Sequence, residues 1–266
     1  MKIGIVGVGV IGNANKIGFE HLGHRVFCHD TKYDTQLSDL VRAQVEIIFV
    51  CVPTPQKVGG ECDTSIVSSV ISELSDLRYD GVIAIRSTVT PGYTASVSSQ
   101  FESLKICFVP EFLRERCAVD DFLYNHKLLA VGTKDSSVYE LVTLAHGNLP
   151  NHTALLSPTE AELLKYYNNV YAALRITFAN VFFEACEKLG ADYTTIKSAY
   201  AKTGKTSGWY LDVNENLRGY GGMCLPKDTK AFAALLEKLG LDFDIVHSID
   251  RDNSKFECTV FDGMRK

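Results

Sequence analysis

The segment 219–228 carries the side chains with the clearest chemical potential in this sequence of 266 residues. It reads Gly-Tyr-Gly-Gly-Met-Cys-Leu-Pro-Lys-Asp, with the thiol at Cys224. Glycines before a cysteine let a substrate approach the backbone, and a nearby lysine and helix start favour the reactive thiolate. Asp228 could act as a general base toward water. The pattern predicts nucleophilic catalysis by Cys224, and its alternative is a buried structural cysteine in a glycine turn.

A second pair of candidates, Lys165 and Asn169, lies four residues apart in a helical pattern. Four residues turn a helix by about 400°, so both side chains share one face. A lysine in this setting is either a placed cation or a surface residue with a buried stem, and spacing alone favours the surface residue.

The N-terminal residues Gly7-Val8-Gly9-Val10-Ile11-Gly12 match the G-x-G-x-x-G pattern of a dinucleotide site. The match follows a predicted strand and opens a helix, the context in which a helix N-terminus faces a pyrophosphate. Asp30 lies eighteen residues after Gly12, at the end of the second predicted strand, where a carboxylate binds ribose hydroxyls. A 2′-phosphate would be repelled by Asp30, so the sequence predicts NAD rather than NADP, although Lys32 nearby softens this preference.

Short apolar runs alternate with helix-length stretches over the first half of the chain. This alternation predicts a doubly wound parallel sheet of Rossmann type with α/β architecture. The expected strands are 2–6, 24–29, 47–52, 82–85, 106–109, 128–131 and 153–156. From Ser157 the pattern is helical: a long helix to about Leu189, then helices over 193–202, 229–239 and 244–255. We therefore expect a cofactor-binding domain over 1–156 and an all-α domain over 157–266 that carries the cysteine loop.

Composition narrows the class of protein. Apolar residues make up 46% of the chain and the formal net charge is −5. This balance excludes intrinsic disorder, and it argues against nucleic acid or an anionic membrane as the main partner. The first residues read as a strand and not as a signal peptide, so we expect a cytoplasmic protein. The cysteines show no zinc-type spacing, and no metal site is expected.

Six segments in order resemble motifs of the UDP-glucose and GDP-mannose dehydrogenases, a family of nucleotide-sugar 6-dehydrogenases. The resemblance covers residues 1–255 and adds four motifs to the glycine loop and the cysteine segment. These are Cys51-Val52-Pro53-Thr54-Pro55 with Asp63 downstream, Arg86-Ser87-Thr88-Val89-Thr90-Pro91-Gly92, Pro110-Glu111-Phe112-Leu113-Arg114-Glu115, and Ala161-Glu162-Leu163-Leu164-Lys165 followed by Asn169.

The resemblance implies that two NAD molecules oxidise a 6-hydroxymethyl group to a carboxylate. Cys224 would form a thiohemiacetal and then a thioester, Lys165 and Asn169 would stabilise the oxyanion, and Asp228 with Thr88 would activate water. Glu115 would lie near the nicotinamide or the sugar. Spacing alone favours a surface position for Lys165, whereas the resemblance to the family favours a catalytic role. Thr88 and Glu115 are also implied NAD contacts. The other implied NAD contacts are Pro53, Thr54 and Lys227, and the other implied substrate contacts are Glu111, Phe112, Leu113, Arg114, Arg218 and Gly221.

The sequence also departs from the family pattern. Family members usually continue with a second α/β domain that helps to bind the nucleotide, and we expect a short form without it. Arg218 stands where an aromatic residue is frequent, and Trp209–Leu217 does not follow the usual sequence. The resemblance further implies a homodimer through the helical domain, UDP-glucose as the default substrate and a role in polysaccharide biosynthesis. Two alternatives stay open: a two-electron dehydrogenase of 3-hydroxyacid or 6-phosphogluconate type, and a non-catalytic NAD-binding module.

Overall fold

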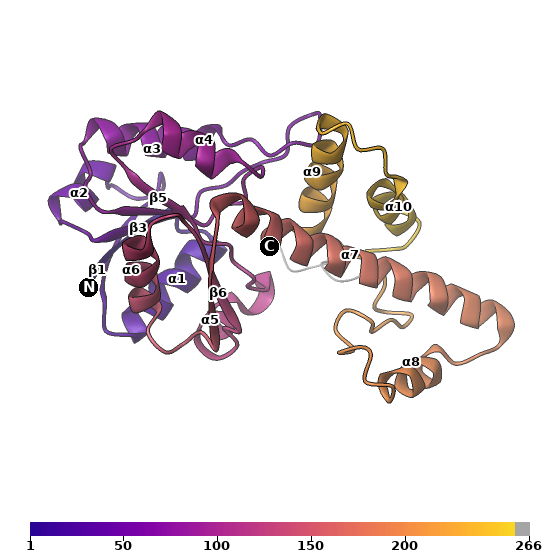
Figure 1. Ribbon diagram of the computed structural model, residues 1–266. Helices are drawn as coiled ribbons and strands as arrows, with labels where there is room; N and C mark the ends of the chain where they lie inside the picture. Colours follow the sequence, from indigo (N-terminus) through magenta and orange to yellow (C-terminus); the bar gives the residue numbers. More distant parts are fainter. Residues whose placement is uncertain (259–266) are drawn as a thin grey trace. The chain divides into compact units, whose positions relative to one another are not determined.

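The computed structural model describes residues 1–258, so residues 259–266 of the expected helical domain lie outside the described part. The chain divides into two compact units (Figure 1). The first unit comprises Met1–Pro55 and Cys62–Lys165. The second comprises Gln56–Glu61 and the chain from Tyr166 onward.

The first unit is built on a seven-stranded sheet in the order β2-β1-β3-β4-β5-β6-β7. Its strands are β1 (Lys2–Val6), β2 (Arg25–His29), β3 (Ile47–Val50), β4 (Val82–Ile85), β5 (Lys105–Phe108), β6 (Leu128–Gly132) and β7 (His152–Leu156). The order reverses at β1, whose neighbours are β2 and β3. In doubly wound sheets this reversal opens the crevice in which cofactors bind.

The predicted parallel pairing holds from β2 to β5 and between β6 and β7. It does not hold where β5 meets β6, because one antiparallel pair, Phe108 with Gly132, joins them. Gly132 lies so close to the first turn of the helix Pro158–Leu189 that a Cβ would come within 2.6 Å of Ala161 Cβ. The pairing at this position therefore depends on a residue without a side chain.

Helices cover both faces of the sheet, as continuous apolar strands require. One apolar core joins the sheet to α2 (Leu37–Arg42), α3 (Ser65–Asp76) and α4 (Tyr93–Gln100). The core on the other face joins it to α1 (Val10–His21), α5 (Ala118–Tyr124) and α6 (Ser136–His146). A short 3-10 helix, η1 (Glu115–Cys117), precedes α5.

The longest helix, α7 (Pro158–Leu189), begins at the predicted cap. The Ser157 amide donates to the Glu160 carboxylate at 2.7 Å, and the Glu160 amide donates to the Ser157 hydroxyl at 3.3 Å. This reciprocal pair is a capping box, which explains why the start was readable from sequence. None of the helices in the described part of the chain is long and apolar enough to span a membrane.

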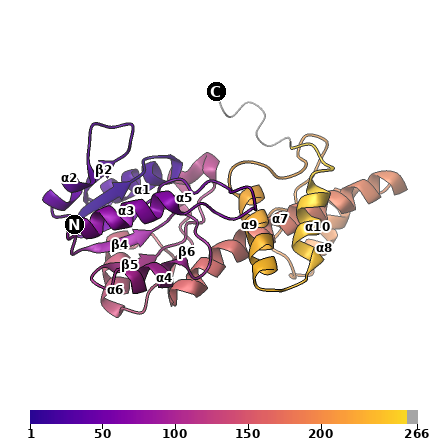
Figure 2. The same cartoon turned by 90° about the horizontal axis from the view of Figure 1, so that it is seen from above.

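The second unit is helical and packs around α7. It contains α8 (Tyr193–Ala201), α9 (Leu225–Lys238) and α10 (Asp244–Asn253), with α9 and α10 side by side (Figures 1 and 2). Buried Ala173, Tyr220 and Ile249 join α7, the loop before α9 and α10 into one small core. A second core links the later part of α7 to α8 through Ala179, Cys186 and Tyr193.

Candidate active site

The glycine turn after β1 has the geometry of a dinucleotide site. Gly7 has φ +88°, and a Cβ there would lie 2.8 Å from the Cys51 carbonyl oxygen. A Cβ on Gly12 would lie 1.9 Å from the Gly7 carbonyl oxygen, so α1 can pack on this turn only with glycine. A Cβ on Gly9 would meet nothing within 4 Å, which leaves open space before the first amides of α1. Val10 and Ile11 form the first helical turn, whose unpaired amides suit a pyrophosphate.

Asp30 follows β2 and faces this turn. Its carboxylate accepts hydrogen bonds from the backbone amides of Val8 at 2.7 Å and Lys32 at 3.0 Å. The amide of Val8, followed by that of Lys32, holds the pKa of the Asp30 carboxyl below its usual range. An ionised acid at this position accepts ribose hydroxyls and repels a 2′-phosphate. These glycines and Asp30 therefore fit NAD.

The loops after β3 and β4 lie together in the same unit. The Ser87 hydroxyl donates to the carbonyl of Val52 at 2.7 Å and contacts that of Val50 at 3.2 Å. In the first loop Pro53 is exposed and Thr54 is buried, and in the second loop Thr88 is half-buried. Ser87 thus joins the two loops in which NAD contacts were predicted.

Lys165 is buried, and its ammonium is bound by the loop after β5. Its Nζ donates to the Glu111 carboxylate at 2.7 Å and to the Glu111 carbonyl at 2.8 Å. The other oxygen of this carboxylate accepts the Leu113 amide at 2.9 Å. Lys165 is therefore a placed cation and not a surface lysine.

The other residues of this loop differ in their exposure and in their hydrogen-bond partners. Phe112, Leu113 and Glu115 are half-buried, and Glu115 opens η1. The Arg114 guanidinium makes two bonds to the Asp121 carboxylate, at 2.7 and 2.9 Å. Arg114, predicted to contact substrate, is thus engaged within its own loop and α5.

The nucleophile candidate lies in the second unit. Cys224 is exposed and forms the N-cap of α9, which begins at Leu225 rather than at the predicted Thr229. The earlier start arises because Pro226 is tolerated in a first helical turn and Asp228 favours it. Cys224 therefore lies at the end of α9 where the helix macrodipole is positive.

Asn169, Asp228 and Lys227 form one polar cluster where α7 meets α9. Asn169 Nδ2 donates to Asp228 Oδ2 at 2.6 Å, and Lys227 Nζ donates to Asp228 Oδ1 at 2.7 Å. Asp228 and Asn169 are both buried. The cluster gives the second unit a carboxylate, an amide and a cation one turn after a surface thiol. Lys227, predicted as a cofactor contact, is bound to Asp228 in this cluster.

Arg218 and Gly221 belong to the loop before α9. Arg218 Nε donates to Asn180 at 2.9 Å, its guanidinium pairs with Glu184, and it lies 4.9 Å from the Phe183 ring centroid. All three partners are on α7, so the Arg218 side chain packs against α7 of its own chain. Gly221 is half-buried beside Gly222, which has φ +78°.

Two supporting residues were not predicted from sequence as part of the site. Asn253 of α10 clamps the backbone of Tyr220: it accepts the Tyr220 amide at 2.9 Å and donates to its carbonyl at 2.9 Å. Glu162 of α7 binds backbone amides at the start of α4. No local pattern marks Asn253, whereas Glu162 belongs to the Ala161–Lys165 motif and could have been singled out.

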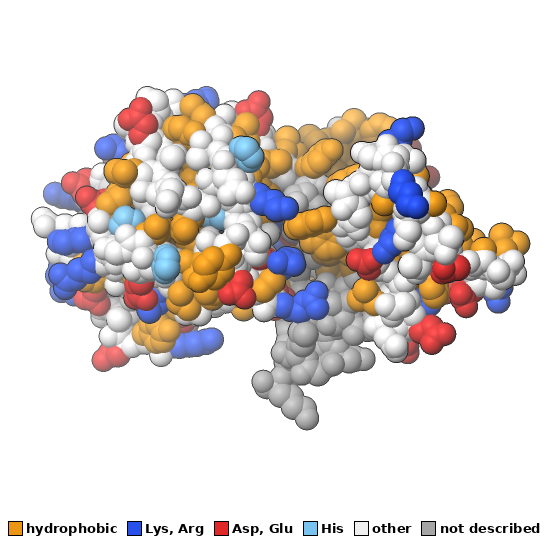
Figure 3. Space-filling model, turned by 90° about the horizontal axis from the view of Figure 1, so that it is seen from below, with side chains coloured by type: hydrophobic (Ala, Val, Ile, Leu, Met, Phe, Trp, Pro, Cys, Tyr) orange, Lys and Arg blue, Asp and Glu red, His pale blue; other side chains and the backbone are white. Residues whose placement is uncertain are grey.

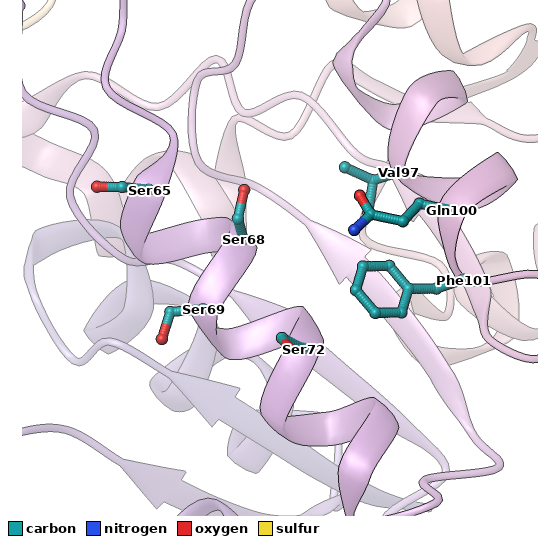
Figure 4. A pocket seen from close by; sticks show the side chains of 7 residues that line it. All are labelled: Ser65, Ser68, Ser69, Ser72, Val97, Gln100 and Phe101. Atoms are coloured by element: carbon teal, nitrogen blue, oxygen red, sulfur yellow. The ribbon is translucent and has the colours of Figure 1, made fainter.

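A surface groove lies apart from these residues. It is lined by one face of α3 and the last part of α4, with Phe101 (Figure 4). None of the predicted site residues lines it. Within residues 1–258, no group of three His, Cys, Asp or Glu side chains could hold a metal ion.

Comparisons with known proteins agree on one family. The NAD binding domain of the UDP-glucose/GDP-mannose dehydrogenase family matches residues 32–146, and the central domain matches residues 159–255. The UDP-glucose 6-dehydrogenase of Rickettsia bellii is 28% identical over 99% of this chain and 69% of its own length.

Solved structures show the same fold. A UDP-glucose dehydrogenase from Pyrobaculum islandicum superposes with a TM-score of 0.83 and 26% identity, over 96% of this chain and 68% of its own. The 3-hydroxyisobutyrate dehydrogenase of Mycobacterium tuberculosis has a TM-score of 0.72 at 15% identity, over 96% of this chain and 92% of its own. The second likeness extends to the fold alone.

Proposed function

Because this chain belongs to the UDP-glucose/GDP-mannose dehydrogenase family, an NAD-dependent group of enzymes, we propose that it oxidises a nucleotide sugar twice at C6. The proposed reaction converts one alcohol, two NAD and one water into a carboxylate, two NADH and three protons. UDP-glucose is the default substrate, since it is the substrate named for the Rickettsia relative. The observation that carries the proposal is the cluster of Asn169, Asp228 and Lys227, which follows Cys224 by one turn of α9.

NAD supplies the chemistry of hydride acceptance, once for each oxidation. In the proposed sequence Asp228 takes the proton of the C6 hydroxyl as the alcohol becomes an aldehyde. The Cys224 sulfur then bonds to the aldehyde carbon, and the oxygen becomes an oxyanion. Lys165 and Asn169, one turn apart on α7, are the proposed donors to that oxyanion, and donors placed where charge develops commonly supply the largest catalytic term.

The second oxidation leaves a thioester on Cys224. Asp228, after releasing its first proton to solvent, removes a proton from water. The water oxygen attacks the acyl carbon, and the carbon–sulfur bond breaks to restore the thiolate. A covalent intermediate of this kind keeps the aldehyde on the protein between the two oxidations. We propose that Thr88 helps to hold the water and that Glu115 lies near the reacting groups, as their motifs imply.

The proposal is tested by the ratio of NADH formed to sugar consumed. Purified, reduced protein is given NAD and a panel of UDP- and GDP-sugars, and the products are quantified. We expect two NADH per sugar, and a loss of carboxylate formation of at least about a hundredfold in Cys224→Ser. Cys258→Ser removes another exposed thiol and serves as the matched control.

Other outcomes distinguish the alternatives. One NADH per substrate with an unchanged rate in Cys224→Ser would indicate a two-electron dehydrogenase. NAD binding without NADH from any donor would indicate a non-catalytic binding module.

We also propose that two copies associate through α7. Five large apolar side chains are exposed on this helix: Tyr167, Tyr171, Phe178, Phe182 and Leu189. The rings of Phe178 and Phe182 pack together with their centroids 4.6 Å apart. Their spacing of four and seven residues places them along one face. Apolar side chains reach the surface of the second unit among charged groups (Figure 3). Large apolar side chains grouped along one exposed helix face are typical of a protein interface.

A further inference from the structure

Glu162 is a buried carboxylate that is not part of the proposed chemistry. It has no exposed surface, and its two oxygens accept the backbone amides of Gly92 at 2.6 Å and Thr94 at 2.8 Å. These amides belong to the start of α4, about seventy residues earlier in the chain. Burial raises the pKa of Glu162, and the bonds from Thr94 and Gly92 oppose that rise by stabilising the ionised form.

Helix α4 depends on this contact because its own sequence supplies few other interactions that would stabilise its start. Its N-cap is Gly92, which has φ +95° and no side chain with which to cap the first amides. Of its eight residues, Thr94 and Val97 are buried. A groove lies between α3 and α4 beyond the first turn, and Ser72, Gln100 and Phe101 are among the residues that line it (Figure 4). The start of α4 is therefore fixed chiefly by Glu162 and by the contact of Tyr93 with Ser68, at 2.8 Å between their hydroxyls.

The same contact fixes one end of the turn that carries Thr88. Ser87 secures the other end by bonding to the carbonyl of Val52, and Val89 in between is fully buried. Glu162 also lies three residues before Lys165, on the same face of α7. One carboxylate thus ties the Thr88 turn to the helix that carries the buried lysine.

We infer that Glu162 is a positioning residue that holds Thr88 in register for NAD. The inference rests on Thr88 being an NAD contact, as the resemblance of its motif to the family implies. In Glu162→Gln one carboxylate oxygen becomes an NH2 group, which cannot accept an amide, so one of the two backbone donors loses its partner. The turn should then move without any change in the groups that bind NAD.

The test combines a local and a functional measurement on the full chain. Amide hydrogen exchange reports the two bonds directly, and titration calorimetry gives the dissociation constant for NAD. In Glu162→Gln we expect exchange at Gly92 and Thr94 to accelerate at least about tenfold, and the dissociation constant to rise about tenfold. Glu160→Gln is the matched control, because this residue also accepts a backbone amide on α7 and a glutamine can keep a capping box.

A double-mutant cycle separates positioning from general stability. If Glu162 acts through Thr88, Glu162→Gln should weaken NAD binding far less in a Thr88→Ala background than in the wild type. Faster exchange with an unchanged dissociation constant, or an equal loss in both backgrounds, would overturn the inference. Should Glu162→Gln fail to fold, Glu162→Asp replaces it, since the shorter acid keeps the charge and cannot reach both amides.

These readouts do not depend on turnover. A wild-type protein that binds NAD and forms no NADH would contradict the proposed function, and exchange and NAD affinity would still decide the role of Glu162.

Discussion

The amide of Asn169 is the contact on which the cluster around Asp228 depends. Because Asn169 Nδ2 donates to Asp228 Oδ2 at 2.6 Å, this asparagine both stabilises the carboxylate and fixes its direction. The carboxylate accepts Lys227 at its other oxygen, so both oxygens are occupied. The direction of the Asp228 carboxylate is therefore fixed by one donor from α7 and one from α9.

Replacing this amide with an acid should disable the base. In Asn169→Asp two buried carboxylates would share one proton, which raises the pKa of the pair. We expect the turnover rate near neutral pH to fall about a hundredfold and to recover partly as the pH rises, because the base must lose the shared proton. A pH–rate profile measures this effect. The matched change Asn151→Asp converts an exposed amide outside this cluster and should keep the wild-type profile.

Sequence patterns predicted the residues of the candidate site, but they did not predict the partner of each residue. Cys224, Asp228, Lys165 and Asn169 were found because their motifs are local. The bond from Lys165 to Glu111 and the clamp of Asn253 on Tyr220 join residues more than thirty positions apart. A single sequence holds no signal for such pairs, because each depends on how separate elements pack.

At the scale of elements, burial made the strands predictable. Two strands, β3 (Ile47–Val50) and β4 (Val82–Ile85), are buried on both faces. Strands of this kind appear in a sequence as unbroken apolar segments. Helix starts were predictable where the cap is local, as at Ser157. The start of α9 was placed four residues late because Pro226 and a charged pair read as a loop, whereas they form its first turn.

Between the sheet and α5 and α6 lies a buried group of histidines beside a cation. Arg86 is buried, and its guanidinium lies 3.5 Å from Nε2 of His146, which is fully buried. The rings of His146 and His126 are 5.6 Å apart. Burial, followed by the charge of Arg86, lowers the pKa of His126 to about 4 and lowers that of His146 well below its ordinary value.

These pKa shifts predict that the free energy of unfolding depends on pH in the acid range. Above pH 6.5 both histidines are neutral in the folded and unfolded chain, so they add no pH dependence. As the pH falls from 6.5 toward 4 the unfolded chain binds protons that the folded chain excludes, and the free energy of unfolding falls. For His126 the loss between pH 7 and pH 5 is about 2 kcal/mol.

Urea unfolding at the two pH values measures this loss. His126→Gln should flatten the dependence on pH, while His21→Gln, on the surface, should keep it. An unchanged slope in His126→Gln would mean that this histidine is not the source.

At the scale of the whole molecule, the chain matches about two thirds of the length of its Rickettsia relative, across both of the family's matched domains. The residues predicted to form the site are distributed over both units. The glycine turn, Asp30, Thr88, Glu111 and Lys165 belong to the first unit, whereas Asn169, Cys224 and Asp228 belong to the second. Helix α7 is the element that carries residues of both sets.

The exposed apolar face of α7 predicts that the protein forms a dimer in solution. We expect light scattering to give twice the chain mass of 29.4 kDa. Phe178→Glu combined with Phe182→Glu places charges on the stripe and should give a single chain, because burying unpaired acids costs more than the contact returns. Phe243→Glu changes an exposed aromatic residue outside α7 and should keep the pair. A wild-type protein that stays single at high concentration would contradict this arrangement.

Two glycines of the first turn, Gly12 and Gly9, differ in what a mutation there would destroy. Any codon change at Gly12 that adds a side chain drives it into the Gly7 carbonyl, so the variant chain would be degraded before it could be assayed. Gly9 has open space in front of it, and its variants would accumulate in the cell at normal levels while failing to retain the dinucleotide. Selection would therefore act on one glycine through protein abundance and on the other through activity alone.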